Sequence, residues 1–123
     1  MDSRNQLEAG PVSDVKDVRR KPRFKLVVDI TIRSESCGLL KARTLDISEV
    51  GIAAVLSEDI PVGEVVKLEI PLPLGRMTIC ATVRQRGSLF RYGFEFLEAN
   101  AVPEILQSTC RLLAIQQSAP GLY

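Results

Sequence analysis

The sequence predicts a mainly β domain, a small antiparallel barrel of six strands followed by one C-terminal helix. Apolar and polar residues alternate along several short runs, Pro- and Gly-containing turns separate those runs, and only the last part of the chain has a helical period. A closed barrel of short strands leaves no exposed sheet edge. With 123 residues, 46% of them hydrophobic, the chain is long enough for one buried core.

The first predicted strand begins at Phe24. Residues 1–17 ahead of it have neither a strand nor a helix period, so we expect a flexible tail there. We expect the folded domain to span residues 18–117 and residues 118–123 to be flexible. The apolar residues expected on the buried face of this strand are Phe24, Leu26, Val28, Ile30 and Ile32.

Five further strands follow in order. They are predicted at residues 39–47, 51–57, 64–72, 76–86 and 89–97, with turn sequences such as "EDIPVGE", "PLPLG" and "RGS" between them. The aromatic residues expected to share the buried face of the last strand are Phe90, Tyr92, Phe94 and Phe96.

The helix is predicted after Asn100, which we expect to be its N-cap. Pro103 is compatible with a helix because it lies in the first turn. The apolar stripe should cover one open end of the barrel. Its members are Val102, Ile105, Leu106, Thr109, Cys110 and Leu113.

Composition disfavours several function classes. The formal net charge is only +1, so attraction to phosphates must come from a local cluster. The chain has no histidine, which removes the usual general base and the commonest zinc ligand, so we expect neither an enzyme nor a metal protein. No apolar run is long enough to span a bilayer, and no membrane span is expected.

The cysteines favour a reducing compartment. Cys37, Cys80 and Cys110 are odd in number and contain no C-x-x-C pair, so we expect them to be reduced and mostly buried. The sequence therefore predicts a cytoplasmic protein.

The only dense basic cluster is "VRRKPRFK", residues 18–25. Pro22 disfavours helical geometry just before it, and in an extended chain the spacing Arg19-x-x-x-Arg23 points both arginines to one side. A guanidinium can bind phosphate or pair with O6 and N7 of guanine. Taken alone, such a stretch is more often simply solvated.

The stretch "DISEVG", residues 46–51, lies between two predicted strands. The Asp46 carboxylate can accept from N1 and N2 of guanine, and Ser48 offers a small donor and acceptor. Gly51 allows a positive φ or the close approach of a ligand. The same residues also form ordinary turns between strands.

The two motifs together resemble the PilZ domain family. They occur in the order R-x-x-x-R before the first strand and D-x-S-x-x-G between the second and third. The resemblance covers residues 18 to about 115, and "YGFEF", residues 92–96, is similar to the family's last strand. It implies a bacterial receptor for the second messenger cyclic di-GMP, built on six antiparallel strands.

The resemblance also implies a ligand site. Arg19 and Arg23 would hold guanine and phosphate, with Arg20 as a further basic residue beside them. The second motif would contribute Asp46, Ser48 and Gly51. Some family members stack a Trp on the base, and because this chain has none, we expect Arg84 or Arg86 to supply that contact.

The expected function is that of a non-enzymatic effector. Because no acidic cluster lies near the basic motif in the sequence, we expect residues 18–24 to be free until cyclic di-GMP closes them onto the barrel, where an unidentified partner protein reads the change. Val18 cannot grip a second ligand molecule, so one ligand per chain is expected. The alternatives are a PilZ-like interaction module without nucleotide binding and a small-barrel nucleic-acid binder, the latter disfavoured by the near-zero net charge.

Overall fold

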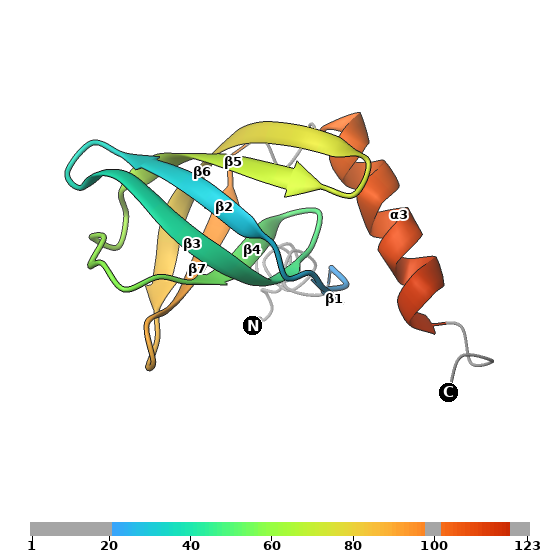
Figure 1. The fold of residues 1–123 in the computed structure, drawn as a ribbon, viewed down its shortest axis with the longest axis horizontal. Coiled ribbons are helices and arrows are strands. Elements are labelled where there is room, and N and C mark those ends of the chain that lie inside the picture. Colours follow the sequence, from blue (N-terminus) through green and yellow to red (C-terminus); the bar gives the residue numbers. More distant parts are fainter. Residues whose placement is uncertain (1–20, 98–101, 119–123) are drawn as a thin grey trace, which may run out of the picture.

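The computed structural model describes residues 21–97 and 102–118. They form a barrel with one helix beside it (Figure 1). The strands are β1 (Phe24–Lys25), β2 (Asp29–Ser34), β3 (Gly38–Ile47), β4 (Gly51–Val55), β5 (Val65–Leu72), β6 (Gly75–Arg86) and β7 (Arg91–Phe96). The helix is α3 (Glu104–Ser118), which ends one residue beyond the predicted domain boundary.

All strand pairs are antiparallel, in the order β1-β3-β2-β5-β6-β7-β4, and a further pairing of β3 with β4 closes the ring. The closed part contains six strands, as predicted. The short strand β1 pairs with the same edge of β3 as β2 does, further along that strand, with Phe24 opposite Ile47. Each predicted strand therefore has a counterpart, and closure leaves β3 paired along both of its edges.

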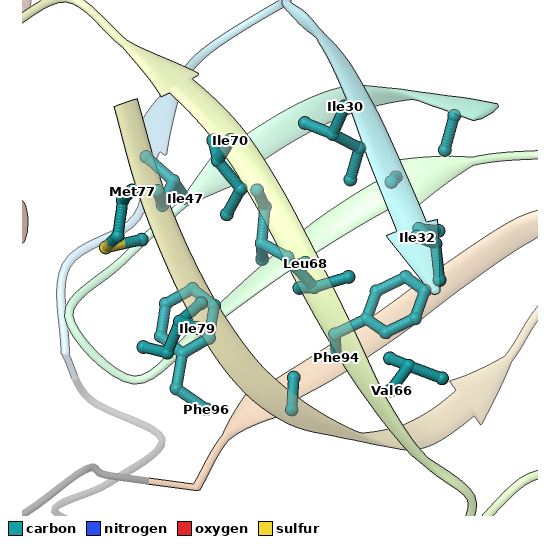
Figure 2. Packing of buried hydrophobic residues seen from close by; sticks show 14 of the residues in the cluster. Ile30, Ile32, Ile47, Val66, Leu68, Ile70, Met77, Ile79, Phe94 and Phe96 are labelled. Atoms are coloured by element: carbon teal, nitrogen blue, oxygen red, sulfur yellow. The ribbon is translucent and has the colours of Figure 1, made fainter. Parts of the chain in front are cut away.

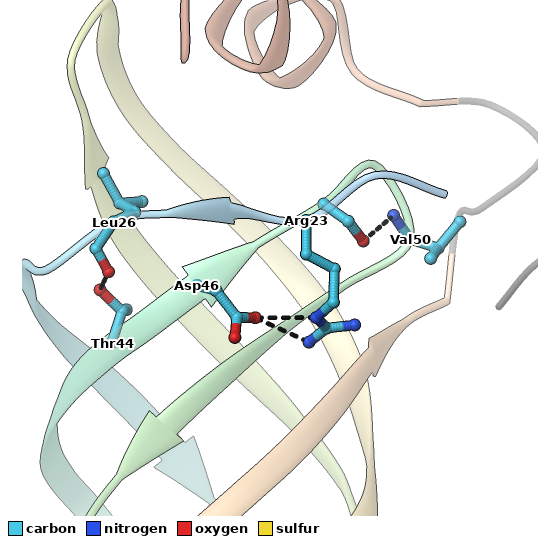
Figure 3. A network of polar contacts seen from close by, with 6 residues as sticks. Arg23, Leu26, Thr44, Asp46 and Val50 are labelled. Atoms are coloured by element: carbon cyan, nitrogen blue, oxygen red, sulfur yellow. Dashed lines mark hydrogen bonds and ion pairs between the residues drawn. The ribbon is translucent and has the colours of Figure 1, made fainter. Parts of the chain in front are cut away.

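The first predicted strand is divided in two between β1 and β2. The hydroxyl of Thr44, on β3, accepts a hydrogen bond from the amide of Val28 at 2.9 Å. The same hydroxyl donates one to the carbonyl of Leu26 at 2.5 Å (Figure 3). Thr44 is fully buried, and its hydroxyl takes the place of the backbone partners that Leu26 and Val28 would have in a regular β-ladder. The hydroxyl therefore accounts for the break between β1 and β2.

The barrel interior is filled by the apolar alternate positions of every strand (Figure 2). Leu26, Ile30 and Ile32 are buried, whereas Phe24 and Val28 are partly buried against the same cluster, so the predicted inward face is confirmed. Most outward strand positions carry charged or polar residues, although Leu39 and Val65 are exposed apolar side chains.

Phe90 does not share the buried face of the last strand, and that prediction was wrong. Strand β7 begins at Arg91, and Leu89 and Phe90 form the hairpin turn with φ values of 59° and 62°. Phe90 is 59% exposed. The amide of Arg91 donates to the Ser88 carbonyl at 3.3 Å, which closes the turn before the strand starts. Tyr92, Phe94 and Phe96 are buried as predicted.

Helix α3 lies across the end of the barrel near β1 and the β5–β6 turn (Figure 1). The Pro103 carbonyl accepts from the amides of Leu106 and Gln107, both at 3.0 Å. Pro103 therefore occupies the N-cap position that was predicted for Asn100, which itself lies outside the described residues. The buried stripe consists of Leu106, Thr109, Cys110 and Leu113, all of them predicted.

The three cysteines are free. Cys110 is buried, while Cys37 and Cys80 are only partly so. Burial, and to a lesser extent the charge of Glu49, raises the pKa of the Cys110 thiol to about 11, so this thiol stays protonated near neutral pH. Within residues 21–97 and 102–118, no helix has the length and apolar character to cross a membrane.

Candidate functional site

Arg23 and Asp46, from the two predicted motifs, are in direct contact. The pairing of β1 with β3 places Lys25 opposite Asp46, and Arg23, two residues earlier, reaches the same carboxylate. Arg23 Nε lies 2.9 Å and Nη2 lies 2.8 Å from Asp46 Oδ1 (Figure 3). Both contacts use one carboxylate oxygen, so within the described part of the chain Oδ2 of Asp46 is available to another donor.

Three further contacts hold the start of the described chain, one to the barrel and two to helix α3. Lys21 Nζ lies 3.9 Å from Glu49 Oε1. The Lys25 amide donates to Gln117 Oε1 at 3.0 Å, and Gln117 Nε2 donates to the Lys25 carbonyl at 2.8 Å. The expectation that residues 18–24 are free without ligand was therefore wrong for Lys21 and Arg23, which each have an acidic partner. Their partners are distant in sequence, and the β1–β3 pairing brings them close.

Ser48 lies in the turn between β3 and β4, Gly51 is the first residue of β4, and both are buried rather than on the surface. Ser48 is fully buried, and its Oγ accepts from the Val50 amide at 3.1 Å (Figure 3). The Ser48 amide donates to the Gly51 carbonyl at 2.9 Å. These contacts match the turn interpretation of the motif, and the ligand contacts expected from both residues stay a prediction.

Gly51 is required by a close approach within the sheet. A Cβ at this position would lie 2.4 Å from the backbone oxygen of Phe94 on β7, which is far inside van der Waals contact. Its φ is not positive, so the first of its two expected roles was wrong. The backbone that it approaches belongs to the protein itself.

Asp46 stands at one end of a register-aligned row on the outer surface of the barrel. Asp46 pairs with Ala53, Ala53 with Gly93, and Gly93 with Gln85. We call these four residues the platform row. Its two central members have almost no side chain, so they form a low floor between the carboxylate and the Gln85 amide.

The platform row lines an open pocket of about 260 Å³. The other lining residues are Arg23, Gly87, Arg91 and Tyr92. Sequence reasoning missed Gln85 and Arg91 as site residues. Arg91 could have been found from the alternation of β7, because it precedes the inward-facing Tyr92 and therefore faces outward.

Two further predicted site residues, Arg84 and Arg86, contact carboxylates outside the pocket. Arg84 Nε lies 2.5 Å from Glu95 Oε1, and Arg86 Nη2 lies 3.2 Å from Asp59 Oδ1. Neither arginine lines the pocket. Arg19 and Arg20 lie outside the described residues.

A closed barrel thus carries a surface pocket with a charged rim and a floor of small residues. The PilZ domain model matches residues 17–109, so the chain belongs to the PilZ domain family. No curated protein matches it.

Solved structures share the fold. The inhibitor of motility MotI/DgrA of Bacillus subtilis is 24% identical with a TM-score of 0.64, and the match covers 82% of this chain and 53% of that one. The PilZ domain of YcgR from Escherichia coli with c-di-GMP is 18% identical with a TM-score of 0.59, covering 81% and 96%. The chain thus spans about half the length of the Bacillus subtilis protein.

A third structure is the PlzA protein of Borreliella burgdorferi in complex with c-di-GMP. It is 16% identical to this chain with a TM-score of 0.58. The match covers 85% of this chain and 44% of PlzA. The likeness in each case is one of fold.

Proposed function

We propose that this chain is a non-enzymatic receptor for cyclic di-GMP that passes the signal to a partner protein. The observation that carries the proposal is the contact between Arg23 and Asp46, one residue from each motif, at the rim of a pocket with a small-residue floor. Membership of the PilZ domain family supports it, as do the fold neighbours YcgR and PlzA, whose structures contain this ligand.

The ligand's chemistry complements the site. Cyclic di-GMP has two phosphates and two guanines. Arg19, Arg20 and Arg23 supply guanidinium groups for phosphate and guanine acceptors, and Oδ2 of Asp46 is free to accept from a guanine N–H. In this proposal, Ser48 and Gly51 contribute through the turn that directs Asp46 outward.

Ligand binding rearranges the motif segment instead of ordering a free one. The Lys21–Glu49 and Arg23–Asp46 pairs are partly exposed, with side-chain exposure of 47% and 33% in the first and 50% and 23% in the second. Such pairs contribute at most about 1 kcal/mol each, so a doubly charged ligand can exchange with them. The altered surface around residues 18–24 is what the partner reads.

The proposed compartment is the cytoplasm. Free cysteines are the norm in a reducing environment, and the three thiols of this chain form no disulfide.

Titration calorimetry with cyclic di-GMP, and separately with a single-stranded RNA, tests the proposal. Heat with cyclic di-GMP alone, at about one ligand per chain and reduced in Arg23→Ala, is expected. Arg76→Ala is the matched control, since Arg76 is an exposed arginine that does not line the pocket. Heat with RNA alone would identify a nucleic-acid binder, and no heat with either would identify a PilZ-like interaction module.

A further inference from the structure

Arg91 places a guanidinium at the rim of the pocket. The neighbouring arginines Arg23, Arg84 and Arg86 each contact a carboxylate. The Arg91 side chain has no hydrogen bond or ion pair to any residue in the described ranges, and it is exposed. A cation left without a partner beside a pocket is available to a ligand.

The backbone of Arg91 is firmly placed. Its carbonyl accepts from the Gly87 amide at 2.7 Å, and the carbonyl of the preceding Phe90 accepts from the Leu56 amide at 3.1 Å. Leu89 and Phe90 hold positive φ values, which are uncommon for bulky residues. Backbone outliers of this kind cluster near functional sites, and this turn delivers Arg91 to the pocket.

Asp46 and Arg91 line the same pocket, whose floor is formed by Ala53 and Gly93, and Arg91 lies one outward position along β7 from Gly93, opposite Val55. Asp46 lies on β3 and Gly93 two strands away on β7, so their Cα atoms are about 10 Å apart at the usual strand spacing. Arg91, two residues before Gly93, points to the same outer face. A purine lying flat on this floor would bring two of its edges within reach of these two side chains.

We propose that Arg91 makes the pocket selective for guanine. Guanine presents the N1–H and N2–H₂ donors on one edge and the O6 and N7 acceptors on the other. Asp46 Oδ2 accepts from the donor edge, and the Arg91 fork donates to O6 and N7. This assignment rests on the proposed cyclic di-GMP function, which does not itself require Arg91.

Adenine does not fit the same pair of side chains. Its N6 amino group would place a donor against the Arg91 donors, and its N1 is an acceptor that would face the Asp46 carboxylate. Unmatched polar groups of this kind reduce affinity more strongly than a missing apolar contact. The pocket should therefore prefer cyclic di-GMP over cyclic di-AMP, with Arg91 responsible for much of the difference.

The test is a competition assay with a fluorescent cyclic di-GMP, which also yields constants for weak competitors. Wild type, Arg91→Ala, Arg91→Lys and the control Arg76→Ala are each titrated with cyclic di-GMP and cyclic di-AMP. In Arg91→Ala, affinity for cyclic di-GMP should fall at least about tenfold while affinity for cyclic di-AMP changes little. Arg91→Lys should restore only part of the loss, because lysine lacks the fork.

Two results would overturn the inference. An equal loss for both ligands would mean that Arg91 contacts phosphate and does not select the base, and unchanged cyclic di-GMP affinity would mean that it has no role. Both results apply only when wild type binds cyclic di-GMP. If wild type does not bind it, the proposed function itself is wrong, and this outcome is distinct from a failure of the Arg91 assignment alone. A thermal melt of each variant confirms that it is folded.

Discussion

Asp46 and the pair Ser48 and Gly51 belong to one six-residue motif but occupy opposite environments. Asp46 is partly exposed and contacts Arg23, whereas Ser48 is fully buried and the backbone of Gly51 lies against that of β7. The motif therefore contains two kinds of residue. Asp46 lines the pocket, whereas Ser48 and Gly51 stabilise the connection from β3 to β4 next to it.

The two environments have different energetic consequences. An exposed ion pair contributes at most about 1 kcal/mol to folding, so Arg23 and Asp46 are available for binding at little expense of stability. A buried turn hydroxyl and a sterically required glycine act on folding itself. Substitutions should therefore separate into those that lower affinity and those that lower the free energy of unfolding.

The largest effect is expected for Gly51→Ala. The added Cβ would lie 2.4 Å from the Phe94 oxygen, so β4 and β7 must move apart. We expect the free energy of unfolding in urea to fall by about 3 kcal/mol. Gly93→Ala is the matched control, because its Cβ would meet Gln85 at an ordinary 3.6 Å. Equal losses in the two variants would contradict the assigned role of Gly51.

The next effect is on affinity. Arg23→Ala should weaken cyclic di-GMP binding by roughly 2 kcal/mol, because it removes charge-assisted hydrogen bonds, and Arg19→Ala should do the same. The free energy of unfolding of Arg23→Ala should change by less than about 1 kcal/mol. Calorimetry and urea unfolding on the same preparations measure both quantities. Unchanged affinity in both variants would remove the arginines from the site.

Asp46→Ala and Ser48→Ala test whether the pocket-lining and the buried residue of the motif have different roles. Asp46→Ala should lower affinity more than Ser48→Ala, because the carboxylate makes the stronger bonds to a ligand. Ser48→Ala should lower the free energy of unfolding more, by about 1 kcal/mol, since it leaves the Val50 amide without its acceptor. The reverse order in affinity would show that the Asp46 carboxylate does not face guanine.

The smallest effect is expected at Glu64, a surface carboxylate that does not line the pocket. Hydrogen bonds from the Ser34 and Ser36 hydroxyls hold the pKa of Glu64 below its ordinary 4.5. A lowered pKa in the folded state means that Glu64 contributes stability above pH 4.5 and loses it as pH falls through the lowered value.

Glu64→Gln should therefore flatten the acid limb of the stability curve and leave affinity for cyclic di-GMP unchanged. Unfolding at a series of pH values below neutrality measures the first, and calorimetry the second. Parallel acid limbs for wild type and Glu64→Gln would show that the carboxylate is not held in this way.

The amino-acid sequence by itself determined the strands, the barrel and the buried stripe of the helix. Alternation with period 2 reports which side of a strand is buried, and that burial is the main driving force of the fold. The inward positions Ile30, Ile32, Tyr92 and Phe94 followed from this pattern. The two motifs were also visible as spacings, as were Arg23 and Asp46 as their charged members.

Only the tertiary structure decided which of those residues meet. The break at Leu26–Val28 depends on a hydroxyl from β3, and the outward turn of Phe90 depends on where the β6–β7 hairpin closes. Arg91 joins the pocket because β4 pairs with β7 and β3 pairs with β4. These contacts depend on the register between strands far apart in the chain, and local periodicity tells which face a residue occupies but not which residue of another strand stands opposite it.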